Sequence, residues 1–241
     1  LAHRRDRRRR RRRDRLLSAG GGSAGRAVVL ISGEGTNLQA FIDAVAAGDL
    51  ALTIAAVVAN RAAAPGLERA RRAGIPAVAV PSAGHPDRAA YDAALAAEIR
   101  GHAPDLVLLA GFMRILGSAF VREFAGRMLN VHPSLLPAYR GLDTHRRVLA
   151  AGDPVHGCTV HFVTDELDGG PPVIQARAPV LPGDDAASLS ARVQAAEHII
   201  YPRAAGWLAS GRLGLRDGAP ELDGRALHEP VIIDPRIESL P

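Results

Sequence analysis

From Arg26 onward, the chain alternates short runs of apolar and β-branched residues with alanine-rich stretches long enough to form helices. This alternation is typical of βα units, in which helices connect parallel strands. The strands predicted in the first half are 27–32, 53–59, 77–80 and 105–111. Asn37 and Asp87 mark two expected helix starts, because both residue types favour helix N-termini.

The second half of the chain has a different pattern. Segments 128–131 and 157–163 are predicted as strands, and 173–180 as a further strand in antiparallel pairing. A long helix is expected over 184–208, interrupted near Pro202, followed by a hairpin around residues 218–220. We therefore predict an α/β fold: a Rossmann-like, mostly parallel sheet with helices on both faces and a mixed C-terminal part. A site would then lie at the carboxyl ends of the strands.

The positive charge of the chain is concentrated at its start. Residues 1–15 hold ten Arg and two Asp, a net charge of +8 within a chain total of +5. Such a run could bind RNA or a membrane surface, but no aromatic residue interrupts it and a Gly/Ser stretch follows. We predict that residues 1–25 form a disordered extension, 26–227 the folded domain, and 228–241 an irregular tail.

Composition excludes several classes of protein. No apolar run approaches the length of a membrane span, and the arginine-rich start does not have the pattern of a signal peptide, so we expect a cytoplasmic protein. Cys158 is the single cysteine, which excludes an intrachain disulfide, and no Cys/His group has the spacing of a structural zinc site.

A glycine-rich segment, SGEGTNL, runs from Ser32 to Leu38 directly after the first predicted strand. A glycine turn between a strand and a helix presents free backbone N–H groups to an anion. Its spacing matches neither the G-x-G-x-x-G of dinucleotide sites nor the lysine-containing P-loop. This segment alone leaves a phosphate site and an ordinary tight turn equally open.

Asn130 and His132 lie two residues apart at the end of a predicted strand, so their side chains project to the same side. An amide N–H and an imidazole directed at one point suit a developing oxyanion. A histidine at a strand end is more often structural, so the pair alone leaves both interpretations open.

The segment HFVTDELDGG carries Asp165, Glu166 and Asp168 on an acidic turn. These carboxylates could favour a protonated imidazole nearby, bind a hard cation, or form a polar turn without further function. Because the turn follows the Asn130 and His132 segment as a second polar motif, we favour the first role, in which the carboxylates favour a protonated imidazole nearby.

Five segments together resemble the glycinamide ribonucleotide formyltransferase family of folate-dependent enzymes. In chain order they are VVLISGEGTNLQAFIDA, AGFMRIL, LNVHPSLLPAYRG, HFVTDELDGGPPVIQA and ARVQAAEHIIYPRAAGWLASGRL, spread over about residues 26–227. The resemblance implies transfer of a formyl group from 10-formyltetrahydrofolate, as co-substrate, to the amine of N1-(5-phosphoribosyl)glycinamide in de novo purine biosynthesis. It implies no metal, two small-molecule substrates, and a monomer or homodimer.

The resemblance also implies roles for individual residues. Asn130 and His132 would stabilise the oxyanion, His132 would protonate the departing folate nitrogen, and Asp168 would support His132. The ribonucleotide would bind at Gly35, Thr36, Asn37, Leu38, Gln39, Gln194 and Glu197. The folate would bind at Arg88, Met113, Arg114, Ile115, Leu116, Asn130, Thr164, Asp165, Glu166, Leu167 and Asp168. His145 and His161 would support the site through packing and hydrogen bonds. Asp143 stands where some relatives have His or Asn, and its charge would alter the electrostatics nearby.

Several alternatives remain. Methionyl-tRNA formyltransferase or a formyltetrahydrofolate hydrolase would share the Asn, His and Asp trio, but each is expected to need a further domain that 241 residues do not accommodate. A sugar-amine formyltransferase would need a nucleotide-sugar pocket. In another class, a nucleic-acid-binding protein acting through residues 1–25 would bind RNA with an affinity that falls steeply with salt.

Overall fold

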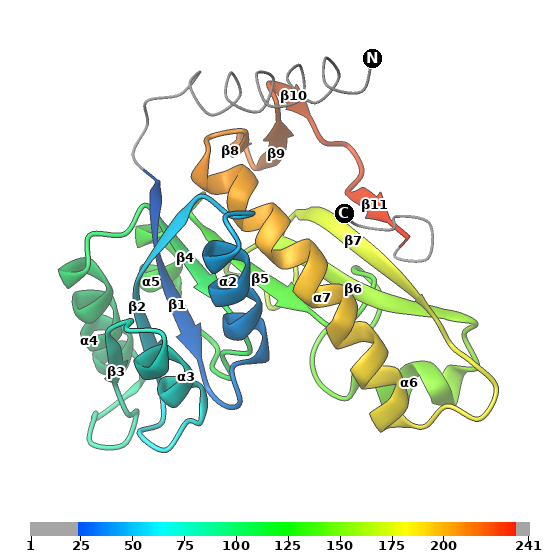
Figure 1. The fold of residues 1–241 in the computed structure, drawn as a ribbon, viewed down its shortest axis with the longest axis horizontal. Coiled ribbons are helices and arrows are strands. Elements are labelled where there is room, and N and C mark those ends of the chain that lie inside the picture. The colour runs from blue at the N-terminus through cyan, green and yellow to red at the C-terminus, as the bar shows by residue number, and fades with distance from the viewer. Residues whose placement is uncertain (1–23, 235–241) are drawn as a thin grey trace, which may run out of the picture.

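The computed structural model describes residues 24–234 of the chain. Its centre is an eight-stranded sheet in the order β11-β7-β6-β5-β4-β1-β2-β3 (Figure 1). The strands are β1 (Gly25–Ile31), β2 (Leu52–Ala59), β3 (Ala77–Ala79), β4 (Leu106–Leu109), β5 (Met128–His132), β6 (Val155–Phe162), β7 (Pro172–Pro179) and β11 (Val231–Ile233). A small antiparallel sheet contains β8 (Leu213–Arg216), β9 (Ala219–Leu222) and β10 (Arg225–Ala226).

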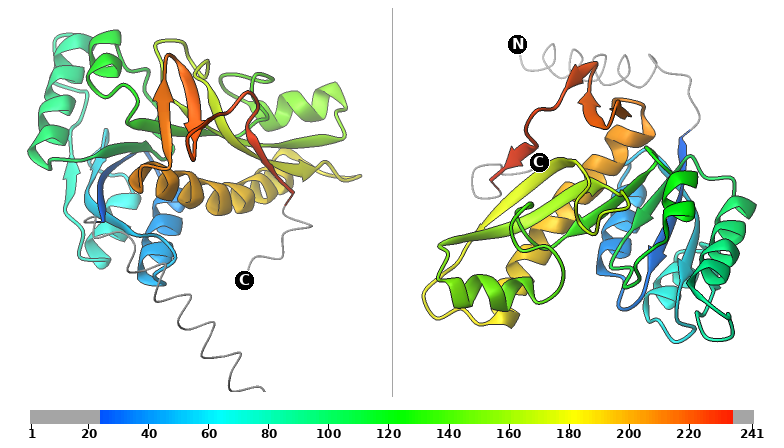
Figure 2. Two further views of the ribbon diagram at one scale, coloured as in Figure 1. Left: turned by 90° about the horizontal axis from the view of Figure 1, so that it is seen from above. Right: turned by 180° about the vertical axis from the view of Figure 1, so that it is seen from behind.

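Helices cover both faces of the large sheet, as Figures 1 and 2 show. They are α2 (Thr36–Ala46), α3 (Gly66–Arg72), α4 (Arg88–Gly101), α5 (Ser118–Glu123), α6 (Thr144–Ala151) and α7 (Ala186–Ala209). Alternate residues of β1 divide the core: Val29 and Ile31 pack with α2, α3 and α7, whereas Val28 and Leu30 pack with α4 and α5. Successive strand residues therefore face opposite sides of the sheet and both sides are buried, which explains the continuous apolar runs in the sequence. The sheet with helices on both faces confirms the predicted α/β class.

The sheet changes direction at β6. Strands β3, β2, β1, β4 and β5 pair in parallel, while β6 is antiparallel to both β5 and β7. The predicted mixed C-terminal part is therefore confirmed. Because the parallel strands all end at the same edge of the sheet, the segments after β1, β4 and β5 lie together there.

The predicted interruption of the long helix is wrong. Helix α7 continues through Pro202. The Tyr201 hydroxyl, fully buried, lies 3.0 Å from the carbonyl oxygen of Leu109 and 2.9 Å from that of Leu129. Packing of this helix against the sheet thus outweighs the loss of one backbone hydrogen bond at proline.

Two further details differ from the sequence-based expectations. The tail beyond residue 227, expected to be irregular, contains β11, which pairs in parallel with β7 at the edge of the sheet. The expected helix start at Asp87 is confirmed, because its side chain caps α4. The expected start at Asn37 is wrong: α2 begins at Thr36, after Gly35, and the Asn37 side chain is buried.

The predicted disordered segment 1–25 lies almost wholly outside the described residues. None of the helices within residues 24–234 is long and apolar enough to cross a membrane.

Candidate active site

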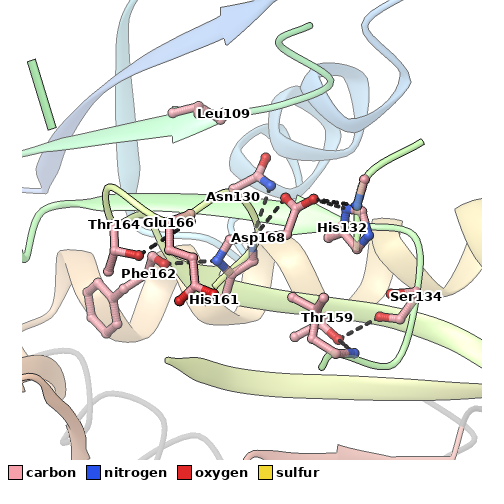
Figure 3. A network of polar contacts seen from close by, with 12 residues as sticks. Leu109, Asn130, His132, Ser134, Thr159, His161, Phe162, Thr164, Glu166 and Asp168 are labelled. Carbon is pink, nitrogen blue, oxygen red and sulfur yellow. Dashed lines mark hydrogen bonds and ion pairs between the residues drawn. The ribbon is translucent and has the colours of Figure 1, made fainter. Parts of the chain in front are cut away.

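The segments singled out from the sequence meet at the carboxyl end of the parallel strands. The glycine loop, residues 32–38, follows β1, and Asn130 and His132 lie at the end of β5. The acidic loop, residues 164–168, follows β6, which places His161 directly opposite Asn130. Figure 3 shows the polar side chains of β5, β6 and the acidic loop gathered in one network.

His132 is 6% exposed and has an acceptor beside each ring nitrogen. Nδ1 lies 3.4 Å from Oδ2 of Asp168, and Nε2 lies 3.0 Å from the carbonyl oxygen of Tyr139. Each ring nitrogen thus has an oxygen to which an N–H could donate. The contact with Asp168 is longer than a charged hydrogen bond of about 2.8 Å, so it acts through charge and leaves Nδ1 able to approach another group.

Asp168 is held by the turn that it belongs to. Its backbone is in the left-handed region at φ 48°, which Asp tolerates better than most residues, and its Oδ2 accepts a 2.9 Å hydrogen bond from the Gly141 N–H. Two residues later, a Cβ at Gly170 would lie 1.8 Å from the carbonyl oxygen of Phe162. Only glycine at position 170 lets the acidic loop return close enough to β6 to bring Asp168 to His132.

His161 fixes the amide of Asn130. Its Nδ1 donates to the carbonyl oxygen of Phe162 at 2.8 Å, which leaves Nε2 to accept from Nδ2 of Asn130 at 3.1 Å. Burial lowers the pKa of His161 to about 4, so the ring is neutral near pH 7 and able to accept. The second N–H of the Asn130 amide is thereby directed away from His161.

Two pockets flank the end of β5. The larger, of about 610 Å³, is called here the glycine-loop pocket. It is lined by residues 32–37, Arg61, Ala110, Gly111, Met113, Val131, Pro133, Ser190, Gln194 and Glu197. The smaller, of about 100 Å³, is called here the apolar pocket. It is lined by Leu109, Phe112, Arg114, Ile115, Leu116, Val121, Asn130, His161, Val163 and residues 164–168.

The alternation of a strand explains this arrangement. Asn130 faces the apolar pocket, while the next residue, Val131, lines the glycine-loop pocket. Asn130 therefore stands at the boundary between the two pockets, and His132, two residues further along β5, is outside both sets of lining residues. A molecule in one pocket can meet a molecule in the other there.

Most residues predicted for the ribonucleotide lie together. Gly35, Thr36, Asn37, Gln194 and Glu197 all line the glycine-loop pocket. The side chains of the other two do not: Leu38 is fully buried in the core, and Gln39 bonds to Asp43 and Arg69.

The residues predicted for folate divide between the pockets. Arg114, Ile115, Leu116, Asn130, Thr164, Asp165, Glu166, Leu167 and Asp168 line the apolar pocket. Met113 lines the glycine-loop pocket instead and is 65% exposed. Arg88, the exposed first residue of α4, is outside both sets of lining residues.

Glu197 and Asn37 form a buried pair at the base of the glycine-loop pocket. Asn37 Nδ2 donates to Glu197 Oε2 at 2.7 Å, and each residue is 8% exposed. Burial raises the pKa of Glu197, and the Asn37 hydrogen bond partly offsets this. The Asn37 Oδ1 atom is buried with no hydrogen-bond partner among the described residues. Buried polar atoms normally have a hydrogen-bond partner, so the Asn37 Oδ1 atom is an exception at this site.

Sequence reasoning missed three participants. Ser32 Oγ accepts the N–H of Met113 at 2.7 Å and joins the glycine loop to the segment after β4. The Tyr139 carbonyl faces His132, and Arg61 lines the glycine-loop pocket. A backbone carbonyl has no sequence signature, but Arg61 could have been found, because it comes two residues after the end of β2, the strand beside β1.

Two further histidines, His145 and His156, contact each other near the site. Nδ1 of His145 lies 3.1 Å from Nε2 of His156, and burial lowers the pKa of both, that of His156 to about 4. Asp143 precedes α6 in a left-handed backbone conformation at φ 58° and is exposed. No group of three or more His, Cys, Asp or Glu residues within the described range is arranged to hold a metal ion.

Comparison with known proteins places the chain in a class. The family model described as formyl transferase matches residues 25–205, and the chain belongs to this formyl transferase family.

Several relatives within this class are named phosphoribosylglycinamide formyltransferase. Phosphoribosylglycinamide formyltransferase of Escherichia coli is 55% identical over 83% of this chain and 94% of its own length. The enzyme of that name from Haemophilus influenzae is 46% identical, over 84% and 95%. The solved phosphoribosylglycinamide formyltransferase of Coxiella burnetii superposes with a TM-score of 0.83 at 50% identity, covering 86% of this chain and 98% of that one.

Proposed function

We propose that this protein is a formyltransferase that moves the formyl group of 10-formyltetrahydrofolate to the amine of N1-(5-phosphoribosyl)glycinamide, a step of purine biosynthesis in the cytoplasm. The observation that carries the proposal is the position of Asn130 at the boundary between two pockets, with His132 two residues along the same strand and Asp168 beside His132. Identity of 55% to an enzyme of that activity supports it.

The chemistry needs stabilisation of charge and no nucleophilic side chain. The amine nitrogen attacks the formyl carbon and forms a tetrahedral intermediate with one oxyanion and one protonated amine. The free N–H of Asn130 and the protonated ring of His132 stabilise the oxyanion. Collapse breaks the bond from carbon to the folate nitrogen, which takes a proton from His132, while the amine releases its own proton.

The remaining polar groups position these two. Neutral His161 accepts one N–H of Asn130 and so orients the other toward the reacting oxygen. The Asp168 carboxylate stabilises the positive charge of His132 before the proton is transferred. Both supports are buried or nearly so, which strengthens their electrostatic effect.

The two pockets suit the two substrates. In the glycine-loop pocket, the phosphate binds at the N-terminus of α2, which no side chain caps, and the ribose hydroxyls bind near Glu197 and Asn37. The folate ring enters the apolar pocket beside Ile115 and Leu116, against the acidic loop.

Turnover tests the proposal directly. Purified protein is mixed with 10-formyltetrahydrofolate, with and without N1-(5-phosphoribosyl)glycinamide, and both tetrahydrofolate release and formylated product are measured. We expect release that depends on the ribonucleotide and matches the product formed. Release without any acceptor would instead indicate a hydrolase, and no release in either mixture would remove the proposed activity.

A further inference from the structure

The glycine-loop pocket has an uneven distribution of charge. Glu34 and Glu197 are its acidic lining residues, and Arg61 is its one basic residue among those that the structure describes. Glu197 is buried and bonded to Asn37, whereas Glu34 and Arg61 are exposed at the rim. A phosphate monoester near neutral pH adds almost two negative charges to this pocket, so a positive charge is needed to offset them.

Arg61 is placed for this role by the contact between two loops. The loop after β2 is bonded to the end of β1 before Arg61 and to the glycine loop after it. The Asn60 N–H donates to the Ile31 carbonyl at 3.4 Å, and the Gly66 N–H donates to the Gly33 carbonyl at 3.0 Å. A Cβ at Gly66 would lie 3.1 Å from the Gly33 carbonyl oxygen and 3.2 Å from the Gly35 Cα, so the two loops pack closely. Arg61 thus stands beside the free N–H groups at the start of α2.

A neighbouring arginine shows the contrast. Arg69 is engaged: its Nε donates to the Glu34 carbonyl at 2.7 Å and its Nη1 to Gln39 Oε1 at 3.3 Å. The Arg61 side chain has no hydrogen bond or ion pair to any residue in the range 24–234, although the Arg61 backbone carbonyl accepts from the Ala64 N–H at 3.2 Å. Arg69 therefore holds the shape of the glycine loop, and Arg61 is available for a ligand.

We infer that Arg61 is the residue by which this site selects a phosphorylated acceptor, and that Glu34 opposes it across the rim. The guanidinium donates to the phosphate oxygens on the side that the helix N-terminus does not reach. Glu34 weakens the binding of the same dianion by repulsion. The inference rests on the proposed function and adds to it which side chains distinguish a phosphorylated from an unphosphorylated acceptor.

The test compares variants on two acceptors, N1-(5-phosphoribosyl)glycinamide and the same riboside without its phosphate. For Arg61→Gln we expect KM for the phosphorylated acceptor to rise about tenfold, with kcat nearly unchanged, because a hydrogen-bonded ion pair is lost. Glu34→Gln should lower that KM about twofold, as expected for an exposed charge. Neither variant should change kcat/KM for the riboside or KM for folate.

Arg122→Gln is the matched control, because Arg122 is also exposed but lies on α5, on the opposite face of the sheet. It should leave all constants unchanged. An Arg61→Gln enzyme with wild-type KM for the phosphorylated acceptor, or with equal losses on both acceptors, would overturn the inference while leaving the transfer activity intact.

A binding measurement separates this inference from the proposed function. Calorimetric titration with ribose 5-phosphate and with ribose needs no turnover. We expect Arg61→Gln to weaken the affinity for ribose 5-phosphate about tenfold, and the loss to shrink as salt is raised. Equal affinity of wild type and variant for ribose 5-phosphate would overturn the role of Arg61 even in a protein that transfers no formyl group.

Discussion

The two pockets beside Asn130 are built by different means. The glycine-loop pocket is made of backbone N–H groups, the buried pair of Asn37 and Glu197, and charged side chains at its rim. The apolar pocket has walls from β4 and the segment after it, closed by the acidic loop. Charged side chains line both pockets: Glu34, Arg61 and Glu197 the first, and Arg114, Asp165, Glu166 and Asp168 the second. Asn130 and His132, for which we propose the catalytic roles, belong to β5, so we expect that binding and catalysis can be altered separately.

The largest expected effect tests that separation. His132→Ala should lower kcat by roughly 10²- to 10⁴-fold, because it removes both the cation near the oxyanion and the proton donor. Since His132 is not a lining residue of the glycine-loop pocket, calorimetry should show unchanged affinity for N1-(5-phosphoribosyl)glycinamide. A large loss of that affinity would show that the two functions are not separate.

Asp168→Asn should cause a smaller loss of kcat, since it keeps the shape of the loop and removes only the charge that supports His132. The measurement is kcat at saturating concentrations of both substrates, with His132→Ala as the reference. A loss as large as that of His132→Ala would contradict a supporting role for Asp168.

Gly170→Ala tests how the apolar pocket is held. The added methyl would lie 1.8 Å from the Phe162 carbonyl oxygen, so the acidic loop must move, at a cost on the order of 3 kcal/mol of unfolding free energy. KM for folate should rise, while affinity for the ribonucleotide stays unchanged. Gly214→Ala is the control, because its Cβ would meet no atom within 4 Å.

The pockets should also respond to pH in opposite directions. His161, on the apolar side, has a folded-state pKa of about 4, below its ordinary value of 6.5. Its contribution to stability is complete above pH 6.5 and is lost as pH falls toward 4, by about 3 kcal/mol in total. His161→Gln should flatten urea unfolding free energies between those values, and the exposed His228→Gln should not.

Glu197, on the glycine-loop side, has a raised pKa, so its contribution to stability falls as pH rises above the ordinary range of a carboxyl group. Glu197→Gln should abolish that dependence. It should also raise KM for the ribonucleotide about tenfold, through loss of a charged hydrogen-bond acceptor, with little change in kcat. A variant with weaker folate binding would contradict the division between the pockets.

The sequence predicted the architecture and the segments that meet at its site, for a physical reason, while the catalytic roles of Asn130, His132 and Asp168 stay a prediction. Strands buried on both faces leave continuous apolar runs, and polar residues at their ends stand out, as Asn130 and His132 do. Contacts between distant segments leave no such pattern. The partnership of Asn37 with Glu197 spans 160 residues, and the continuity of α7 through Pro202 depends on the hydroxyl of Tyr201 and two strands. The hidden edge strand β11 is only three residues long, too short to show a periodicity.

Tyr201 bears on the distance between the two proposed substrates, because it fixes the position of α7 along the sheet. Its hydroxyl is bonded to the carbonyls of Leu109 and Leu129, so α7 cannot slide along its own axis relative to β4 and β5. Glu197 stands one helical turn before Tyr201 on the same face of α7. A displacement of one residue along the helix is about 1.5 Å, and a reactive approach tolerates little more than about 3.5 Å between the two atoms. A phenol outside both pockets thereby sets how far the bound acceptor stands from the end of β5.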